Sequence, residues 1–501
     1  MESAIPPIRI RALNQRAVRP DGDFVLYWMV AQRRLGWNFA LDRAVEHALE
    51  LGRPLVILEA LRCDYPWASV RHHRFVLDGM RDHAATAGEF PVRYLPYVEP
   101  ERGAGKGLLA SLGKRACVLV TDDAPHFFYP AMLDAAARQV PVLLEAVDSH
   151  GLLPLREPQR GFTAAYHFRI HLHKVLLEQV GDRPRAHPLR EARDRLPDPA
   201  PLSAPDGPLS SVMARWPMAS AGLLEGPGIP GTIPVDGGVP PVPFRGGTAA
   251  ARSRLGSFVE ERLAVYHERR NDPDAEAGSR LSPYLHWGHI STHEIFQRVV
   301  EREGWTPLRV RAEHRGKRAG WWGMSPEAEA FLDELLTWRE LGFNEWVRGG
   351  PAVETFQSLP DWARQTLLEH ADDERPHRYD FRDFDQARTH DPLWNAAQRE
   401  LREEGTIHNY LRMLWGKKIL EWSSHPREAL ETMLELNNRY AVDGRDPNST
   451  TGIMWVLGRY DRGWPERAIY GKVRSMSSES TRRKVSVDRY LSRFSGQNTL
   501  I

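Results

Sequence analysis

With 501 residues, the chain is long enough for two or three domains that each bury a core. Its hydrophobic fraction of 42% and charged fraction of 27% are ordinary for a globular protein, and a net charge of +1 confines any nucleic-acid affinity to a local patch. The two cysteines, Cys63 and Cys117, exclude a disulfide framework and a cysteine-based metal site, which fits a reducing cytoplasm. Because no apolar run reaches 18 residues and residues 1–20 lack a signal-peptide core, we expect a cytoplasmic protein without membrane spans.

Residues 22–200 alternate between short apolar runs and stretches with helical periodicity. The runs are too short for helices, whereas the stretches between them repeat apolar residues every three or four positions. This alternation predicts a parallel sheet whose strands are joined by crossover helices. The expected strands are residues 24–29, 54–59, 91–95, 116–121 and 140–145, and the expected helices include residues 38–51, 69–87 and 129–138.

Two motifs in this half suggest a function that their details do not support. The glycine-rich segment 103–107 is similar to a phosphate loop, but it lacks the earlier glycine and the Ser or Thr after Lys106 that such a loop needs. His167, His171 and His173 suggest a metal site, yet only His167 and His171 share a helix face and no third ligand accompanies them. We expect a surface loop, structural histidines and no bound metal.

Residues 198–247 are dense in Pro, Gly and Ala, a composition that cannot form a long helix. We therefore divide the chain into an α/β domain over residues 1–197, a linker over residues 198–245 and a helical domain over residues 246–501. The linker is expected to follow the surface between the domains, and a disordered tether is the alternative.

Two helix starts in the second half could hold an anion. Gly246 and Gly247 precede Thr248, a possible N-cap, and glycines let backbone amides approach an anion at the positive end of a helix. Further on, Ser282 is a possible cap with Pro283 at the first helical position. Each pattern alone is also that of an ordinary helix start.

Residues 331–343, FLDELLTWRELGF, have the pattern of an amphipathic helix that carries Glu340. A single glutamate on such a helix is usually a solvated surface residue, so the pattern alone assigns it no role.

Residues 389–457 predict a series of helices with clear boundaries. Asp391 is a plausible N-cap with Pro392 at the first helical position, and Gly405 suits a helix C-terminus. A second helix is expected over about residues 407–422, and a third starts at His425-Pro426 and ends near residues 437–438.

Tryptophan is concentrated in this stretch, and the whole chain contains 16 tryptophans against 14 tyrosines and 17 phenylalanines. Trp415 and Trp422 are seven residues apart, so they share a helix face about 10 Å apart along its axis. Periodicity alone does not distinguish tryptophans that fill a core from tryptophans that conduct electrons to a cofactor.

Four long motifs identify a family resemblance. The segments HDPLWNAAQ, HNYLRMLWGKKILEW, LNNRY-x2-DGRDPNSTTGIMW and RYDRGW-x-ERAIYGKVRSM resemble the FAD domain of the class II cyclobutane pyrimidine dimer photolyases. The opening VLYWM, followed by Gln32-Arg33 and Asn38, also resembles the class II pattern. The resemblance implies a Rossmann-like α/β domain, with a parallel sheet, followed by an all-α FAD-binding domain. It also implies a monomer that splits pyrimidine dimers in UV-damaged DNA with light.

The resemblance further implies the cofactors. FAD would bind non-covalently, with Asn437 facing its N5 and stabilising its reduced forms. Trp415, Trp394 and Trp422 would form the chain that photoreduces oxidised flavin. In this family the α/β domain can hold an antenna pigment, a deazaflavin or methenyltetrahydrofolate, and the sequence does not show which, or whether one binds. The implied FAD contacts are Gly246, Gly247, Thr248, Ser282, Leu285, Asn409, Arg412, Trp415, Asn437, Asp443 and Asp446.

The active-site glutamate is implied in the same way. Glu340 matches the glutamate of the family motif R-R-E-L-x-x-N-F, where it would hydrogen-bond the dimer and steady its anion radical, with Asn344 as its neighbour. Two residues depart from the motif: Trp338 stands where class II members have Arg, and Glu345 replaces an aromatic residue. Both departures bear on the shape of the substrate pocket.

Other residues are implied to contact the lesion or the DNA. Met413 and Trp455 would pack against a dimer flipped out of the duplex, and Arg270 and Asn271 resemble a further contact. The C-terminal region has the local excess of positive charge that phosphate neutralisation requires, and a solvated basic face is the alternative. Its basic residues are Arg459, Arg462, Arg467, Lys472, Arg474, Arg482, Arg483, Lys484, Arg489 and Arg493, against Asp461, Glu466, Glu479 and Asp488.

Three other functions compete with repair of these dimers. A cryptochrome-like blue-light photoreceptor would share the fold and the flavin chemistry without repair, and the joint presence of Glu340, Met413 and Trp455 favours repair over it. A (6-4) photoproduct enzyme is disfavoured because no matching histidine pair is visible. A flavin-free helical DNA-binding protein would be colourless.

Overall fold

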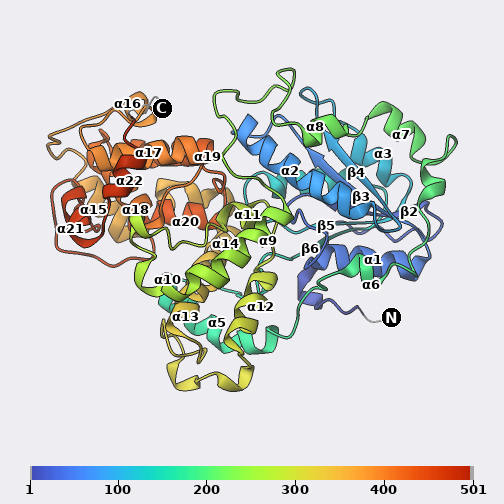
Figure 1. Cartoon of the computed structure of the whole chain (residues 1–501), viewed down its shortest axis with the longest axis horizontal. Helices are drawn as coiled ribbons and strands as arrows, with labels where there is room; N and C mark the ends of the chain where they lie inside the picture. Colours follow the sequence, from blue (N-terminus) through green and yellow to red (C-terminus); the bar gives the residue numbers. More distant parts are fainter. Residues whose placement is uncertain (1–2, 497–501) are drawn as a thin grey trace. The chain divides into compact units, whose positions relative to one another are not determined.

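The computed structural model describes residues 3–496, which form two compact units (Figure 1). Unit 1 comprises residues 1–159, 175–255 and 281–299, and unit 2 comprises residues 160–174, 256–280 and 300–501. The chain therefore passes between the units several times. The three predicted ranges place this boundary differently, since residues 246–255 and 281–299 pack in unit 1 and residues 160–174 pack in unit 2.

Unit 1 contains one six-stranded sheet in the order β1-β6-β5-β2-β3-β4. Five strands are parallel, as predicted, and β1 pairs antiparallel with β6 at the edge. The strand β1 is short and has no apolar run, so no pattern in the sequence predicts it. The strands are β1 (Ile10–Ala12), β2 (Phe24–Met29), β3 (Leu55–Leu61), β4 (Val92–Val98), β5 (Ala116–Asp122) and β6 (Leu144–Val147).

The sheet is buried on both faces, which explains its continuous apolar runs. In β2, Phe24, Leu26 and Trp28 enter one hydrophobic cluster, whereas Val25, Tyr27 and Met29 enter the other, because successive side chains point to opposite faces. The clusters are covered by α1 and α6 on one face and by α3, α4 and α7 on the other. The helices of unit 1 are η1 (Pro7–Arg9), α1 (Phe39–Leu51), α2 (Val70–Ala87), α3 (Leu108–Gly113), α4 (Tyr129–Gln139), α6 (Pro188–Glu191), η2 (Ala200–Ser203), α7 (Ser210–Arg215), α8 (Ala221–Glu225), most of α9 (Thr248–Ser257), α11 (Ser282–His286) and most of α12 (Thr292–Glu303).

A carboxylate closes the switch point of the sheet, between β2 and β5. Asp122 Oδ2 accepts hydrogen bonds from the backbone N–H groups of Val30, Ala31 and Gln32, at 2.9, 2.8 and 2.8 Å. In open α/β sheets this is the place where nucleotide phosphates usually bind. Here the backbone N–H groups that could bind a phosphate already donate to the Asp122 carboxylate.

The Pro- and Gly-rich residues 198–245 belong to unit 1 and pack on it. They form only short helices, as their composition predicts, but Leu202, Leu209, Val212 and Trp216 are buried in one of the two hydrophobic clusters. The segment is therefore part of a packed unit.

Unit 2 is helical, and its helix boundaries follow the sequence closely where capping residues mark them. Asp391 caps α17, Gly405 ends it with φ +66°, and His425 caps α19. Two segments, η3 and η7, have π-helical hydrogen bonding, which no sequence pattern indicated. The elements are α5 (Ala165–Gln179, its last residues in unit 1), η3 (Phe258–Arg262), α10 (Leu263–Arg269), η4 (Pro273–Ala275), η5 (Pro307–Arg309), η6 (Ala312–His314), α13 (Pro326–Leu332), η7 (Asp333–Trp338), α14 (Arg339–Gly349), η8 (Gly350–Glu354), η9 (Phe356–Ser358), α15 (Asp361–Glu369), α16 (Phe381–Asp385), α17 (Pro392–Glu404), α18 (Asn409–Trp422), α19 (Pro426–Tyr440), α20 (Pro447–Val456), α21 (Ser478–Lys484) and α22 (Asp488–Arg493).

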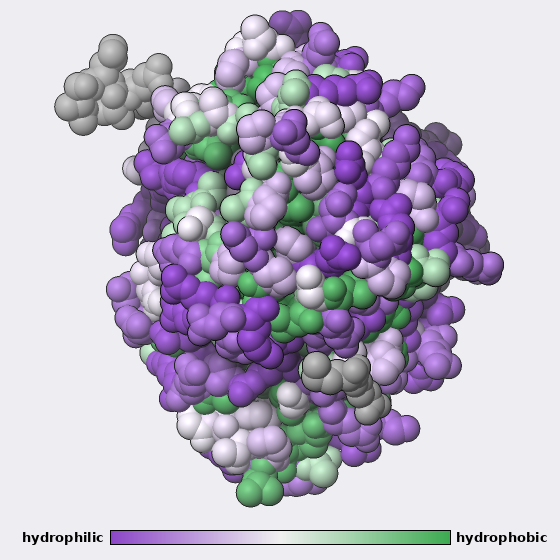
Figure 2. All heavy atoms as spheres, turned by 90° about the vertical axis from the view of Figure 1, so that its right-hand side faces the viewer, coloured by the Kyte–Doolittle hydropathy of each residue, from purple (hydrophilic) through white to green (hydrophobic). Residues whose placement is uncertain are grey.

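The surface shown in Figure 2 is mostly hydrophilic, with apolar residues in small groups between polar ones. Within residues 3–496, no helix is long and apolar enough to cross a membrane. The same residues contain no cluster of three or more His, Cys, Asp or Glu side chains that could hold a metal ion.

Candidate active site

A polar network joins three helices of unit 2. Arg412 on α18 donates to Asn437 Oδ1 on α19 (3.2 Å), to Ser449 Oγ on α20 (3.3 Å) and to Asp443 Oδ1 (3.4 Å). The Asn437 amide in turn donates to Ser449 Oγ (2.9 Å) and to Asn438 Oδ1 (3.1 Å). Asn437 is buried, whereas Arg412 and Asp443 keep part of their side chains in solvent. The predicted residues Arg412, Asn437 and Asp443 are thus brought together.

The turn between α19 and α20 fixes this network. Arg445 has a left-handed backbone (φ +68°), and its N–H donates to Asn438 Oδ1 (2.9 Å). Asp446, predicted as a cofactor contact, caps α20 by accepting from the N–H of Asn448 (2.9 Å). Asn409, another predicted contact, is exposed at the first residue of α18, where the network opens to solvent.

A column of three tryptophans lies beside the network. Trp394 on α17 donates its indole N–H to the backbone carbonyl of Trp415 (3.0 Å), and its ring centroid is 5.9 Å from that of Trp422. Trp415 donates to Gln398 Oε1 (2.9 Å). Because Trp415 lies one helical turn after Arg412 on α18, this helix connects the polar network to the column.

The column ends below the surface. Trp394, Trp415 and Trp422 are all at most 2% exposed, so the predicted chain of indoles does not itself reach solvent. The Trp422 ring contacts two further rings, Tyr379 (centroids 5.6 Å apart) and His390 (5.0 Å). His390 is exposed, which makes this pair the outward continuation of the column.

Glu340 is buried (5% exposed) near the start of α14, directly after the π-helical segment η7. Its helix packs closely on α20 at Gly342, where an added Cβ would lie 2.8 Å from Thr451 Oγ1 and 2.9 Å from the Pro447 carbonyl oxygen. Asn344 is also buried, with Nδ2 donating to the Arg160 carbonyl (3.3 Å). π-helical segments occur frequently at functional sites, and the catalytic role of Glu340 stays a prediction.

The two residues that depart from the family motif lie in different settings. Trp338 is half-buried at the end of η7. Glu345 accepts a hydrogen bond from the Tyr460 hydroxyl (3.2 Å) and lies 3.9 Å from Arg459 Nη1. The residue that replaces an aromatic side chain is therefore tied to the segment after α20.

An aromatic and cationic cluster follows α20. Arg474 lies over the rings of both Trp455 (5.8 Å) and Trp464 (5.0 Å), and Arg462 also lies over Trp464 (5.3 Å). Beneath Trp455, the Lys417 ammonium donates to the Val456 carbonyl (2.5 Å). Burial lowers the pKa of Lys417 to about 7. Met413, predicted to line the lesion site, is half-buried on α18.

Arg270 and Asn271, the two residues of a predicted DNA or lesion contact, lie in different environments. Arg270 donates to the Ala330 carbonyl (3.2 Å) and lies over the Tyr266 ring (5.4 Å), so it braces α13 against α10. Asn271 is exposed.

In unit 1, the structure corrects the predicted phosphate site at the start of α9. The N–H groups of Gly246, Gly247 and Ala249 donate to Asp78 Oδ2 (3.0 Å), His289 Nδ1 (2.9 Å) and Asp82 Oδ2 (3.0 Å). These N–H groups therefore already have hydrogen-bond acceptors within unit 1. Thr248 is the first helical residue and not the cap, and its buried hydroxyl has no hydrogen-bond partner among residues 3–496.

The second predicted helix start is corrected in a similar way. α11 begins at Ser282, so the preceding Leu281 is the cap position and no side chain caps the helix. Ser282 is exposed and Leu285 is half-buried.

The basic C-terminal residues do not form one uniform surface. Arg459 is buried and donates to the Ser358 carbonyl (3.0 Å), Arg493 pairs with Glu276 and Glu404 (both 2.5 Å), and Arg483 pairs with Glu479 (2.9 Å). The exposed basic residues that form no ion pair with another residue in the range 3–496 include Arg462, Arg467, Lys472, Arg482 and Lys484.

Four residues of the site were not predicted. Ser449 bridges Arg412 and Asn437, and its position three residues after the α20 cap could have identified it. Lys417 is hidden in an apolar helix sequence, and Tyr379 and His390 lie in a segment without periodicity, so no local pattern indicated them.

Comparisons with known proteins agree with the predicted family. No protein-family model matches the chain. The chain is 34% identical over 498 residues to a deoxyribodipyrimidine photo-lyase of Methanothermobacter thermautotrophicus, covering 97% of this chain and 98% of that protein. It is also 34% identical over 511 residues to a deoxyribodipyrimidine photo-lyase of Oryza sativa subsp. japonica, covering 98% and 91%.

A solved structure shows a similar fold. The crystal structure of a class III photolyase from Agrobacterium tumefaciens matches 95% of this chain and 86% of that one with a TM-score of 0.65, at 18% sequence identity. The predicted fold class, an α/β domain with a parallel sheet followed by a helical domain, is confirmed. With 34% identity over nearly the whole length of two curated relatives, the chain belongs to the deoxyribodipyrimidine photo-lyases, a family of DNA-repair lyases.

Proposed function

We propose that the chain is a class II photolyase, which splits cyclobutane pyrimidine dimers in DNA with light and non-covalently bound FAD. The observation that carries the proposal is the double role of α18, whose Arg412 enters the polar network while Trp415 enters the tryptophan column. A cofactor held at α18 would lie next to the tryptophan column, which could carry electrons to it. The class II assignment rests on the four sequence motifs.

The polar network fits the edge of a flavin ring. Arg412 offers cationic N–H donors, Asn437 offers an amide with both donor and acceptor atoms, and Asp443 offers a carboxylate. Such a mixed set suits a heterocycle that presents N–H and carbonyl groups along one edge. When bound, FAD supplies the electron-transfer chemistry, and the protein supplies its position and electrostatic surroundings.

The other proposed cofactor contacts differ in how well they fit. Asn409 and Ser282 have exposed side chains, and the buried Thr248 hydroxyl has no partner among the described residues, so each can contact a ligand. The amides of Gly246 and Gly247 are engaged and do not fit a phosphate.

We assign substrate roles to residues of α14, α18 and α20 and of the segment that follows α20. Glu340 would hydrogen-bond the dimer from a buried position, where a fixed polar group acts most strongly. Met413 and Trp455 would form the apolar wall against the flipped dimer, and Arg462 and Arg474 would contact phosphates. An antenna pigment in unit 1 and a monomeric state also remain proposals.

A repair assay tests the function. The purified protein should be yellow from its flavin, and after chemical reduction it should restore thymine absorbance in dimer-containing oligothymidine under blue light but not in the dark. A flavin-containing protein that photoreduces normally and leaves the dimer content unchanged would identify a photoreceptor instead. A colourless protein that cannot be loaded with FAD would contradict both functions.

A further inference from the structure

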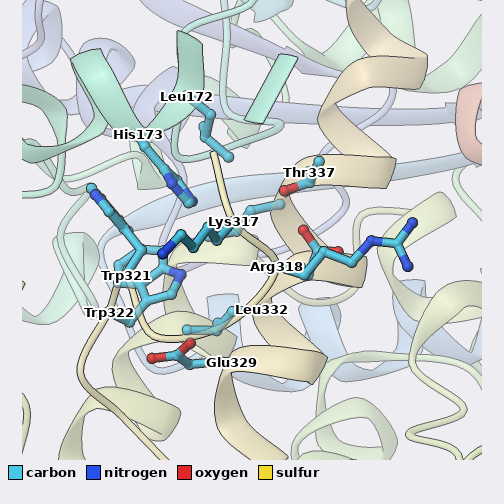
Figure 3. A pocket seen from close by; sticks show the side chains of 11 residues that line it. Leu172, His173, Lys317, Arg318, Trp321, Trp322, Glu329, Leu332 and Thr337 are labelled. Carbon is cyan, nitrogen blue, oxygen red and sulfur yellow. The ribbon is translucent and has the colours of Figure 1, made fainter. Parts of the chain in front are cut away.

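The pocket shown in Figure 3 lies in unit 2, between α5, the loop before α13, α13 and η7. On one side of it the His173 imidazole lies flat on the Trp321 indole, with ring centroids 3.9 Å apart. Two carboxylates, Glu329 and Asp333, also line it. Its volume of about 10 Å³ leaves room for no more than one water molecule. The pocket is therefore too small for a ligand other than water.

A buried cation elsewhere in unit 2 is not explained by packing. Lys417 on α18 has no solvent exposure, although lysine is almost never fully buried unless it is paired. Its ammonium donates to the Val456 carbonyl (2.5 Å) and makes no other hydrogen bond and no ion pair within residues 3–496. Because burying an ammonium costs free energy, an apolar side chain of similar length would suit packing better. We therefore expect the charge to have a function.

The two groups beside the Lys417 ammonium both favour a positive charge. The ammonium lies over the Trp455 ring, 5.5 Å from its centroid, and the face of an indole attracts cations. The Val456 carbonyl belongs to the last residue of α20, at the negative end of the helix dipole. Since Trp455 is half-buried, the buried ammonium contacts a ring that is partly accessible from solvent.

Lys417 is held in place beside Trp455 by its neighbours. An added Cβ at the adjacent Gly416 would lie 2.7 Å from Val456 Cγ2, so α18 and α20 are in close contact here. The Tyr470 hydroxyl, from the segment after α20, lies 3.0 Å from the backbone carbonyl oxygen of Lys417. The lysine therefore joins α18, α20 and the segment that follows α20.

The charge of Lys417 depends on pH. Burial lowers the pKa of Lys417 to about 7, an effect that Asp461 opposes and Arg474 increases. The Tyr470 hydroxyl also contacts the Glu421 carboxylate, and burial raises the pKa of Tyr470 well above its usual value, so this hydroxyl stays neutral. From about pH 6 to 9 the Lys417 side chain therefore changes from an ammonium to a neutral amine.

We propose that Lys417 is a positioning residue for the lesion, because its ammonium holds the Trp455 ring in the orientation against which the flipped dimer packs. This proposal rests on the proposed function, in which Trp455 forms part of the wall of the lesion site. A ring that is fixed before the lesion binds loses less conformational freedom on binding, and this raises the affinity for the lesion. Loss of the Lys417 proton removes the cation–π contact, so it should weaken binding of damaged DNA more than binding of undamaged DNA.

The test measures how strongly the protein prefers damaged DNA. FAD-loaded protein is kept oxidised and in the dark, so that no dimer is split. Fluorescence anisotropy gives its affinity for a thymine-containing duplex with and without a pyrimidine dimer. The readout is the ratio of these two affinities, measured at intervals from about pH 6 to 9.

Four variants are compared with the wild type: Lys417→Met, Lys417→Arg, Trp455→Ala and the double substitution K417M/W455A. The matched control is Lys418→Met. It removes a neighbouring cation of α18 that lies over a different ring, that of Trp422 (5.2 Å).

We expect the wild-type ratio to fall roughly three- to tenfold as the pH rises through about 7, in line with the loss of one cation–π contact. In Lys417→Met the ratio should be low at every pH. In Lys417→Arg, whose guanidinium stays charged, it should not fall with pH. The double variant should be no weaker than Trp455→Ala, because Lys417 acts through that ring. Lys418→Met should follow the wild type.

The proposal is overturned if the wild-type ratio is constant over this pH range, or if Lys417→Met or Lys417→Arg shows the same fall as the wild type. It is also overturned if the losses in Lys417→Met and Trp455→Ala add in the double variant. The wild-type profile needs no substitution, so it decides the question even if Lys417→Met does not fold. A wild-type protein that binds damaged and undamaged DNA equally at every pH would contradict the proposed function, and this proposal with it.

Discussion

The indole N–H of Trp394 donates to the backbone carbonyl of Trp415, and this hydrogen bond ties α17 to α18 at the centre of the tryptophan column. Both rings are almost completely buried, so their positions are set by the surrounding core. The contact lies on the proposed electron route, and Trp394 makes no hydrogen bond to Arg412, Asn437 or Asp443, so substituting Trp394 tests the route separately from the polar network.

Replacing Trp394 with Phe should slow photoreduction of oxidised FAD under blue light while sparing repair by chemically reduced enzyme. Phe keeps the ring contact with Trp422 but is much harder to oxidise than indole. Photoreduction is followed by flavin absorbance with an external reductant present. The control Trp305→Phe removes another buried indole outside the column and should have no such effect. Equal loss of photoreduction and repair would count against the route.

The substitution Arg412→Gln should weaken FAD binding by roughly 10- to 100-fold, because hydrogen bonds to charged groups contribute about 1.5–3 kcal/mol. It removes the positive charge that links Asp443, Asn437 and Ser449. Affinity is measured by fluorescence titration of the apoprotein with FAD. The exposed Arg382→Gln on α16 is the control. An unchanged dissociation constant would place the flavin elsewhere.

The substitution Glu340→Gln should retain FAD and lower the repair yield roughly three- to tenfold, as expected for loss of one hydrogen bond of about 0.5–1.5 kcal/mol in the reacting state. Repair yield per absorbed photon is measured with reduced enzyme, beside the exposed control Glu369→Gln. Full yield in the Glu340 variant would remove this residue from the active site.

The close packing of α14 on α20 predicts that Gly342→Ala destabilises the protein by about 1–3 kcal/mol, since the new methyl group would overlap Thr451 and the Pro447 carbonyl. Gly452 on α20 has no heavy atom within 4 Å of an added Cβ. Gly452→Ala should therefore be neutral or stabilise by up to about 1 kcal/mol. Urea unfolding measures both, and equal stability of the two variants would contradict the packing.

A pH-dependent contribution to stability is expected from Glu400. Burial raises the pKa of Glu400 to about 7, and its Oε2 accepts from the Tyr490 hydroxyl (2.7 Å) and from the N–H of His408 (2.9 Å). Between about pH 4.5 and 7 the folded protein therefore binds more protons than the unfolded chain, so this contribution to stability falls as pH rises, by roughly 1.4 kcal/mol per unit of pKa difference.

The substitution Glu400→Gln should remove that dependence, whereas the exposed Glu403→Gln should preserve it. The measurement is the free energy of unfolding in urea at pH 5, 6 and 7. Parallel pH profiles for the wild type and Glu400→Gln would show that Glu400 is ionised in the folded protein at all three values.

The sequence predicted those features that depend on neighbours along the chain. Asp391 and Gly405 bound α17 as expected, because caps act on the nearest backbone groups. The apolar run at residues 140–145 predicts a strand that in fact begins later, at Leu144. Pro141 has no N–H to donate to a ladder.

The features that the sequence could not predict depend on partners far away in the chain. The Gly246 and Gly247 amides were expected to be available, but Asp78 and His289 reach them across more than 40 residues. The outward continuation of the tryptophan column through Tyr379 and His390 likewise depends on tertiary packing against Trp422. Motif resemblance found the network residues, whereas local patterns alone did not.

The π-helical segment η7 ends at Trp338, two residues before Glu340. A π-helical turn accommodates one residue more than an α-helical turn, so deleting a single residue between Asp333 and Trp338 would restore regular α-helical winding. Because the widened turn takes up the extra residue by itself, the helix on either side of the deletion would keep its facing, and Gly342 would still pack on α20. A one-residue deletion here would thus change the backbone hydrogen bonding directly before Glu340 while leaving the packed helix in register.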